Sequence, residues 1–206
     1  MKACRKIAAL ALCAVLLVSL MPIVFAADAA PALQFDENGE FKILIVADTQ
    51  DIDKPQKETI ALLEAELDAA QPDLVVFLGD QIHGPSIGKS VERTQKALDA
   101  FLQPVAERGL QFAVVFGNHD DEGGVSKEAQ MEYYQSYPGC LMSAGPDDIT
   151  GCGNYNLLVW SSDGSRPVCN LWFLDSGTYG EKGVSKYARV EQDQIGWYTS
   201  TAAALK

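Results

Sequence analysis

Short, almost continuous apolar runs alternate with longer segments of helical periodicity in the first part of the chain. Residues 41–47, 74–78 and 112–116 are such runs, and their content of β-branched and apolar residues is typical of strands that are buried on both faces. Between them, residues 56–70 and 90–107 place apolar side chains at helical spacing. This alternation predicts an α/β fold whose sheet has a parallel core and right-handed crossovers.

The pattern changes after the third run. Residues 126–137 and 190–205 are predicted to be helices, and residues 155–160 and 168–174 are predicted to be strands joined by a turn-rich connector. Pro104 lies inside the earlier helical segment and is expected to break or kink it.

The first 26 residues have the pattern of a secretory signal peptide. A basic start is followed by an apolar run over residues 7–25, and Ala26 is the kind of small residue after which signal peptidases cut. We therefore predict a signal peptide over 1–26 and a protein that is secreted, periplasmic or held at the cell surface. The alternative is an uncleaved anchor, because an apolar run of this length can span a bilayer. Membrane contact is expected only in that case.

Length and charge limit the number of domains and the classes of ligand that the chain could bind. After a linker over residues 27–40, residues 41–206 are predicted to form one domain, since a chain of 206 residues has room for one of ordinary size. The formal net charge of −12 at pH 7 repels phosphate backbones, so nucleic-acid binding is not expected. A small phosphorylated substrate held through metal ions remains compatible with this charge, because bound cations dominate the local field.

Cysteine usage depends on the export prediction. Removal of the signal peptide leaves Cys140, Cys152 and Cys169. In an oxidising compartment Cys140 and Cys152 could close a short loop, with Cys169 left inside an apolar strand, but the odd number keeps this pairing open. The chain has no C-x-x-C pair, so a thiolate zinc site is not supported.

Oxygen-bearing side chains follow each of the three predicted parallel strands. The strands lead into Asp48-Thr49-Gln50, Gly79-Asp80-Gln81 and Gly117-Asn118-His119-Asp120. Ligands of open α/β sheets bind outside the carboxyl ends of the strands, so these blocks are expected to converge on one rim. Carboxylate and amide oxygens suit cations such as Mn, Mg, Fe or Zn. One such residue alone is explained as a turn former, but three consecutive strands that end this way indicate a site.

These blocks, in this order, resemble the signature of the calcineurin-like metallophosphoesterases. That signature reads D-x-H, then G-D, then G-N-H-D or G-N-H-E, each after a strand, and the match here runs from Phe41 to Asp120. Gln50 stands where histidine is usual, as in bacterial members of the purple-acid-phosphatase-like branch that look similar. The resemblance implies an α/β/β/α sandwich around a mixed sheet with a parallel core.

The resemblance also implies a chemistry. Two divalent metal ions (Mn, Fe, Zn or Mg) would be bridged by Asp80, with Asp48 and Gln50 on the first ion and Asn118 on the second. The pair would activate a water that attacks a small phosphoester substrate, either a monoester or a diester. His119 would donate a proton to the leaving group or stabilise it, and Asp120 would orient the imidazole.

Neighbouring polar residues have weaker support. His83 could reach the rim as a substrate contact, but a solvated loop histidine is the simpler explanation. Asp175, after a later strand, is predicted to be a turn residue at the edge of the site. Asp121 and Glu122 are predicted to belong to a solvated acidic loop.

One feature of the family is missing from this sequence. Family members complete the second metal site with histidines from their C-terminal half, whereas His83 and His119 are the two histidines of this chain. We therefore expect the N-terminal portion of a longer reading frame, truncated at the C-terminus and carrying the first three blocks only. The alternative is a secreted, non-catalytic binding domain with a degenerate site. A nucleotidase or cyclic-nucleotide esterase would differ from the first reading only in substrate.

Overall fold

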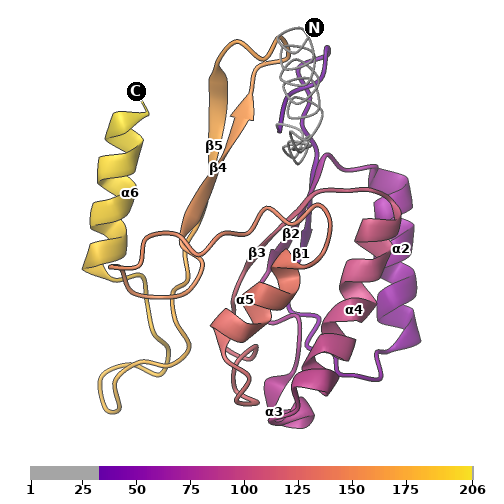
Figure 1. Cartoon of the computed structure of the whole chain (residues 1–206), viewed down its shortest axis with the longest axis vertical. Helices are drawn as coiled ribbons and strands as arrows, with labels where there is room; N and C mark the ends of the chain where they lie inside the picture. The colour runs from indigo at the N-terminus through magenta and orange to yellow at the C-terminus, as the bar shows by residue number, and fades with distance from the viewer. Residues whose placement is uncertain (1–32, 206) are drawn as a thin grey trace, which may run out of the picture. The chain divides into compact units, whose positions relative to one another are not determined.

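A parallel sheet forms the centre of the fold. The structure is a computed structural model that describes residues 33–205, so the predicted signal peptide (1–26) lies outside the described residues. Strands β1 (Ile43–Val46), β2 (Leu74–Leu78) and β3 (Phe112–Val115) pair in parallel in the order β1-β2-β3 (Figure 1). The α/β class and the parallel core predicted from the sequence are confirmed.

Two long helices cover one face of this sheet. Helices α2 (Lys57–Ala70) and α4 (Val91–Glu107) lie side by side and pack against each other (Figure 1). A short helix, α3 (Gly84–Ile87), which was not predicted, precedes α4. Helix α4 continues through Pro104, so the expected break is absent.

The other face of the sheet is partly open. Ile45 and Leu78 are 60% and 50% exposed, whereas Leu44 and Val46 are half-buried on the helix side. The expectation that the first strand is buried on both faces is therefore wrong. β1 is an edge strand, and the open face forms one wall of a groove whose other wall is the end of the later hairpin, residues 171–174.

An antiparallel hairpin forms a second, separate sheet. Strands β4 (Tyr155–Trp160) and β5 (Pro167–Phe173) pair with each other, and the chain just before β1 pairs with the end of β4. Leu33 is buried there, and its carbonyl accepts the N–H of Trp160 at 2.8 Å. Residues 33–35 thus belong to the folded domain, which corrects the predicted linker over 27–40 in this part.

A tyrosine connects the hairpin to the parallel sheet. The hydroxyl of Tyr155 donates to the carbonyl of Val114 at 2.7 Å and accepts the N–H of Val114 at 2.9 Å. Further along the same strand, Leu141 N–H donates to the carbonyl of Phe112 at 2.8 Å. Backbone groups of β3 on the side away from β2 are therefore satisfied by a side chain and by an irregular segment.

Two more helices complete the described chain. Helix α5 (Lys127–Gln135) begins at Ser126, whose Oγ accepts the N–H of Ala129. Helix α6 (Gln192–Ala204) begins with a capping box. An aromatic cluster connects α6 to β5, because the ring of Trp172 lies 5.4 Å from that of Trp197 and 4.7 Å from that of Tyr198. Within residues 33–205, no helix has the length and apolar character needed to cross a membrane.

The cysteines outside the predicted signal peptide are free. Cys140 lies in the segment that runs along the edge of β3, and Cys152 is buried near Asp175, so the possible pairing of the two is not formed. Cys169 lies inside a strand, as expected, and is exposed in β5. Burial raises the pKa of the Cys140 and Cys152 thiols to about 11, which keeps both in the unreactive thiol form.

Candidate functional site

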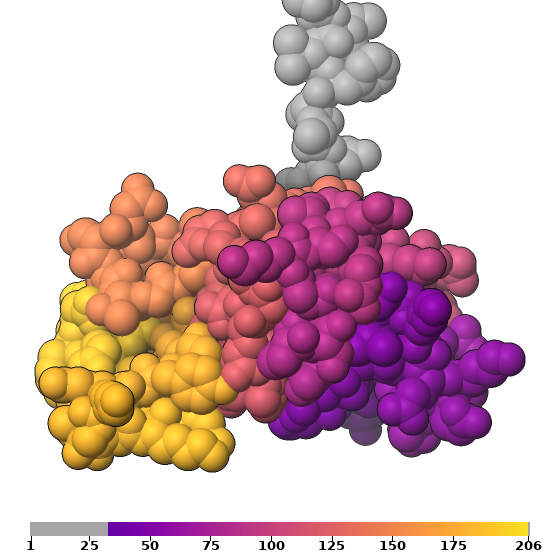
Figure 2. All heavy atoms as spheres, turned by 90° about the horizontal axis from the view of Figure 1, so that it is seen from below, coloured from indigo at the N-terminus to yellow at the C-terminus, as the bar shows by residue number. Residues whose placement is uncertain are grey.

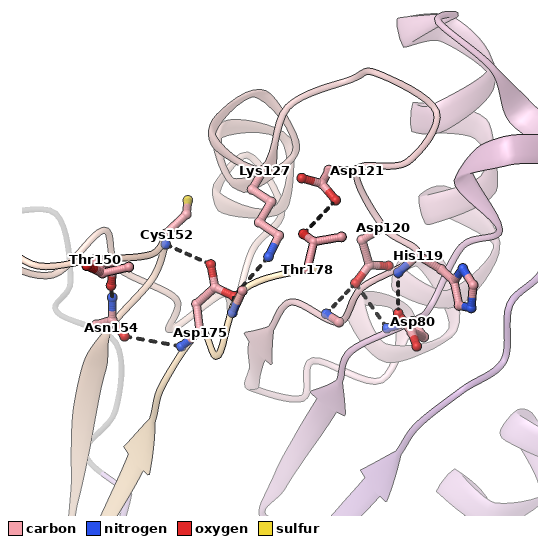
Figure 3. Close-up of polar contacts among 12 residues, drawn as sticks. Asp80, His119, Asp120, Asp121, Lys127, Thr150, Cys152, Asn154, Asp175 and Thr178 are labelled. Atoms are coloured by element: carbon pink, nitrogen blue, oxygen red, sulfur yellow. Dashed lines mark hydrogen bonds and ion pairs between the residues drawn. The ribbon is translucent and has the colours of Figure 1, made fainter. Parts of the chain in front are cut away.

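The three strand-end blocks meet at the carboxyl edge of the parallel sheet. The N–H of Asp48 donates to the carbonyl of Gly79 at 3.2 Å, and the N–H of Gln50 donates to the carbonyl of Asp80 at 2.9 Å. The third block joins them because the N–H of His119 donates to Oδ1 of Asp80 at 2.7 Å (Figure 3). The expected convergence on one rim is therefore present in the structure.

Three of the predicted metal ligands have an unusual backbone conformation. Asp48, Gln50 and Asp80 have φ angles of 53°, 44° and 52°, in the left-handed region that side-chain-bearing residues seldom adopt. Among the described non-glycine residues, the remaining case is Gln71, which ends α2. Such conformations persist where the surrounding structure enforces them, and they are concentrated at functional sites.

Glycines before the acidic and amide residues allow the close approach of the second and third blocks. A Cβ atom on Gly79 would lie 2.6 Å from the nitrogen of Gly117, and a Cβ on Gly117 would lie 2.2 Å from Oδ1 of Asp80. Gly79 also has a φ of 80°. Any side chain at either position would push the second block away from the third.

Asp120 holds these loops together rather than orienting His119. Its side chain is buried; Oδ2 accepts the N–H groups of Gly117 at 2.8 Å and of Asp80 at 3.0 Å, and Oδ1 accepts the N–H of Gln81 at 3.0 Å. Burial raises the pKa of Asp120 to about 6, against the opposing effect of the backbone N–H groups. The prediction that Asp120 orients the imidazole is wrong, because its oxygens are used by backbone donors.

Glu122 is the hydrogen-bonding partner of His119. Oε2 of Glu122 pairs with Nδ1 of His119, and this hydrogen bond raises the pKa of His119 while partial desolvation lowers it. Glu122 was expected to be solvated, but its carboxylate is largely buried and its Oε1 accepts the hydroxyl of Tyr179.

His83 lies beside His119. Their ring centroids are 5.5 Å apart, and Nδ1 of His83 pairs with Oγ of Ser86 at 2.7 Å. The structure therefore places His83 next to His119, half-buried, in the loop that leads into α3.

A second polar network lies beside the rim and involves Asp175. This carboxylate is buried, pairs with Nζ of Lys127 at 2.8 Å and accepts the N–H of Cys152 at 2.9 Å (Figure 3). It connects α5 to the segment after β5, so Asp175 is a structural ion-pair residue and not simply a turn residue. Gln194 joins the network from α6 by donating to the carbonyl of Asp175 at 2.6 Å.

The roles of three residues at or beside the rim, Gln81, Glu122 and Tyr179, were not predicted from the sequence. Gln81 is buried and donates to the carbonyls of Val46 at 3.1 Å and Gly79 at 2.8 Å, which joins the ends of β1 and β2. The one feature of the sequence that pointed to Gln81 was its position next to Asp80. Glu122 follows His119 by three residues, a spacing that could have suggested the contact, whereas nothing local indicated Tyr179.

The predicted ligands at the rim carry donor atoms of the types that divalent cations accept. The predicted ligands offer two carboxylates, Asp48 and Asp80, and two amides, Gln50 and Asn118, of which Asp48 and Gln50 are exposed. Within the described part of the chain, hydrogen bonding engages Oδ1 of Asp80 and leaves Oδ2 available. Within residues 33–205, no group of three or more His, Cys, Asp or Glu residues is arranged to hold a metal ion, so a site at the rim would depend on amide as well as carboxylate oxygens.

Known proteins are similar in sequence to this chain. The family model described as calcineurin-like phosphoesterase matches residues 41–198. Two proteins of Arabidopsis thaliana, named probable inactive purple acid phosphatase 14 and 29, are 32% and 31% identical, and each match covers 84% of this chain and 49% or 50% of the relative. Phosphatase DCR2 of Saccharomyces cerevisiae is 33% identical over 75% of this chain and 30% of its own length.

These matches concern only part of each relative. The chain spans about half the length of the two plant proteins and less of the yeast protein. The family model, in contrast, covers more than half of this chain, from just before β1 into α6. With its three strand-end blocks on one rim, the chain belongs to the calcineurin-like phosphoesterase family.

Proposed function

We propose that this chain carries the first three motif blocks of a metal-dependent phosphoesterase that hydrolyses phosphate mono- or diesters. The observation that carries the proposal is the direct hydrogen bonding between the three strand ends, with Asp48, Gln50 and Asp80 in left-handed conformations. A small phosphoester is the expected substrate, because the acidic surface disfavours nucleic-acid backbones.

The residues at the rim have separable tasks in this proposal. Asp48, Gln50, Asp80 and Asn118 would hold two divalent ions, of Mn, Fe, Zn or Mg, which supply an activated water and neutralise phosphate charge when bound. Asp120 and Gln81 keep the ligand-bearing loops together through buried hydrogen bonds.

His119 is the proton donor in this proposal. Its Nδ1 is paired with Glu122, which leaves Nε2 for the leaving oxygen of the ester. In the protonated imidazole this nitrogen can transfer a proton as the bond to phosphorus breaks. In this proposal His83, whose ring centroid lies 5.5 Å from that of His119, would contact a phosphate oxygen.

A second candidate function is a non-catalytic binding domain with a degenerate site. One observation favours it: the plant relatives carry the word inactive in their names. A domain can keep its fold while its site loses the reaction.

One experiment separates these functions. The purified full-length protein would be analysed for bound metal and assayed on p-nitrophenyl phosphate and bis(p-nitrophenyl) phosphate, with and without a chelator. The phosphoesterase predicts bound metal and hydrolysis that the chelator, Asp48→Asn and His119→Ala each abolish, with Asp121→Asn as the matched control. Hydrolysis that survives both the chelator and His119→Ala, or no hydrolysis at all, would overturn it.

We also propose that the protein is exported. The basis is the basic start and apolar run that precede Ala26. Intact-mass measurement on the exported protein should give an N-terminus at Ala27. An N-terminus at Met1 in a membrane fraction would instead support the uncleaved anchor.

A further inference from the structure

Glu122 uses its two carboxylate oxygens on two different partners. Oε2 pairs with Nδ1 of His119, and Oε1 accepts the hydroxyl of Tyr179. The side chain of Glu122 is only 16% exposed. A carboxylate with both oxygens engaged and little contact with water has one orientation, so the imidazole that it contacts is oriented as well.

Tyr179 reaches this carboxylate from a distant part of the sequence. It follows β5 and is 57 residues from Glu122. The neighbouring residue makes a second contact between the same two segments, because Oγ1 of Thr178 donates to Oδ1 of Asp121 at 3.1 Å (Figure 3). In Figure 2 the gold spheres of the segment after β5 abut the salmon spheres of the chain around residue 125.

The backbone that carries Glu122 is also held in place by the start of α3. The N–H of Gly84, at the start of α3, donates to the carbonyl of His119 at 3.1 Å. A Cβ atom on Gly123 would lie 2.5 Å from the carbonyl oxygen of Gly84, so the two segments are in direct backbone contact. The segment from His119 to Gly123 therefore has contacts from α3 on one side and from Thr178 and Tyr179 on another.

We propose that Glu122 and Tyr179 act in series as positioning residues for His119. Glu122 accepts the Nδ1–H of the imidazole, so that Nε2 is the nitrogen that faces a substrate, and Tyr179 holds Glu122 in the orientation that does so. This role in catalysis rests on the proposed phosphoesterase function, but the orientation of the imidazole is a property of the folded chain by itself.

The composition of the chain allows a direct test. His83 and His119 are its only histidines, so the full chain labelled with ¹⁵N-histidine gives two imidazole patterns in a long-range ¹H–¹⁵N correlation spectrum. His83→Gln assigns them. In the neutral form, His119 should carry its proton on Nδ1. Glu122→Ala should shift it to the Nε2–H form that dominates in free histidine, and Glu122→Gln, which keeps an acceptor oxygen, should restore the Nδ1–H form.

Tyr179→Phe provides the second part of the test. Loss of its hydroxyl should give a mixture of the two tautomers, whereas Tyr187→Phe should change nothing. Tyr187 is a good control because it pairs with Tyr179 in the same segment and is similarly exposed. The proposal is overturned if His119 keeps one tautomer in Glu122→Ala, or if Tyr179→Phe and Tyr187→Phe behave alike. If Glu122→Ala does not fold by far-UV circular dichroism, the comparison of the two tyrosine variants decides.

Kinetics separate this proposal from the proposed function. On p-nitrophenyl phosphate, Glu122→Ala should lower kcat at least tenfold and Tyr179→Phe about threefold, with KM changed less than twofold. If the tautomers shift as expected but neither the unchanged chain nor any variant hydrolyses the ester, the positioning role is supported and the phosphoesterase is contradicted. If neither Glu122→Ala nor Tyr179→Phe changes hydrolysis, the catalytic part of the positioning role is contradicted, whereas the phosphoesterase proposal is not.

Discussion

The carboxylate of Asp120 accepts the backbone N–H of Asp80 at 3.0 Å, across forty residues of sequence. Asp80 is the residue predicted to bridge two metal ions, and its backbone has a left-handed conformation. The contact therefore couples a buried acid of the third strand-end block to the conformation of the central ligand in the second block.

Asp120→Asn should destabilise the fold by about 1–3 kcal/mol. The amide has one acceptor oxygen, so its NH2 group would face backbone N–H groups that Asp120 now satisfies. Urea unfolding followed by far-UV circular dichroism measures this cost. Asp121→Asn, in the adjacent and less buried position, serves as the control, and equal midpoints for the two variants would contradict the role given to Asp120.

The charge of His119 should depend on Glu122. Because the hydrogen bond from Glu122 raises the pKa of His119 above its usual 6.5, the folded chain favours the protonated imidazole. The resulting stability is fully present below that usual value and is lost as the pH rises through the folded pKa. Glu122→Gln should lower the pKa of His119 in an NMR titration, and its loss of stability should be larger at low pH than at high pH. A pKa unchanged by Glu122→Gln, with Glu128→Gln as the control, would refute this.

Gly117→Ala should disrupt the rim, although alanine is normally a mild substitution. The added Cβ would lie 2.2 Å from Oδ1 and 2.6 Å from the backbone nitrogen of Asp80, so the two blocks must separate at a cost of at least about 2 kcal/mol. Gly196→Ala in α6 is the matched control. Its Cβ meets nothing within 4 Å, and it should gain roughly 0.5–1 kcal/mol in helix propensity. In urea unfolding, Gly117→Ala should lower the free energy of unfolding and Gly196→Ala should raise it. A Gly117→Ala variant as stable as the unchanged chain would contradict the steric argument.

Tyr155→Phe should cost about 1–3 kcal/mol, since it leaves the buried N–H and carbonyl of Val114 without their partner. Tyr198→Phe should stay within about 0.5 kcal/mol, because that side chain is substantially exposed. Thermal unfolding by circular dichroism compares the two. Similar losses for both variants would mean that the hydroxyl of Tyr155 contributes little to the β3 edge.

The local sequence pattern was sufficient to predict the strands and the convergence of their carboxyl ends on one rim. Apolar runs gave β2 and β4 with the bounds that the structure has, and parallel strands necessarily bring their carboxyl ends together. The exposure of Ile45 could not be predicted in the same way. A run of apolar residues has the same appearance in a central strand and in an edge strand, and only the neighbouring elements decide how much of it is covered.

The contacts of the candidate site were harder to predict than its members. Asp120 and His119 are adjacent in sequence, which suggested a pair, but buried backbone N–H groups bind the carboxylate of Asp120 instead. The contact of Tyr179 with Glu122 depends on the path by which the segment after β5 returns to the sheet. The hydrophobic pattern of the sequence contains no information about that path. The assignment of Asp48, Gln50, Asp80 and Asn118 as metal ligands stays a prediction.

The aromatic cluster around Trp172 determines which signals will follow unfolding. All three tryptophans of the chain, Trp160, Trp172 and Trp197, lie in β4, β5 and α6, and the part of the chain that forms the parallel sheet has none. Tryptophan fluorescence therefore reports the melting of the hairpin and the last helix, while the strands that carry the rim contribute nothing to it. A fluorescent label near residue 120 would be needed to observe whether the two parts of the domain unfold together.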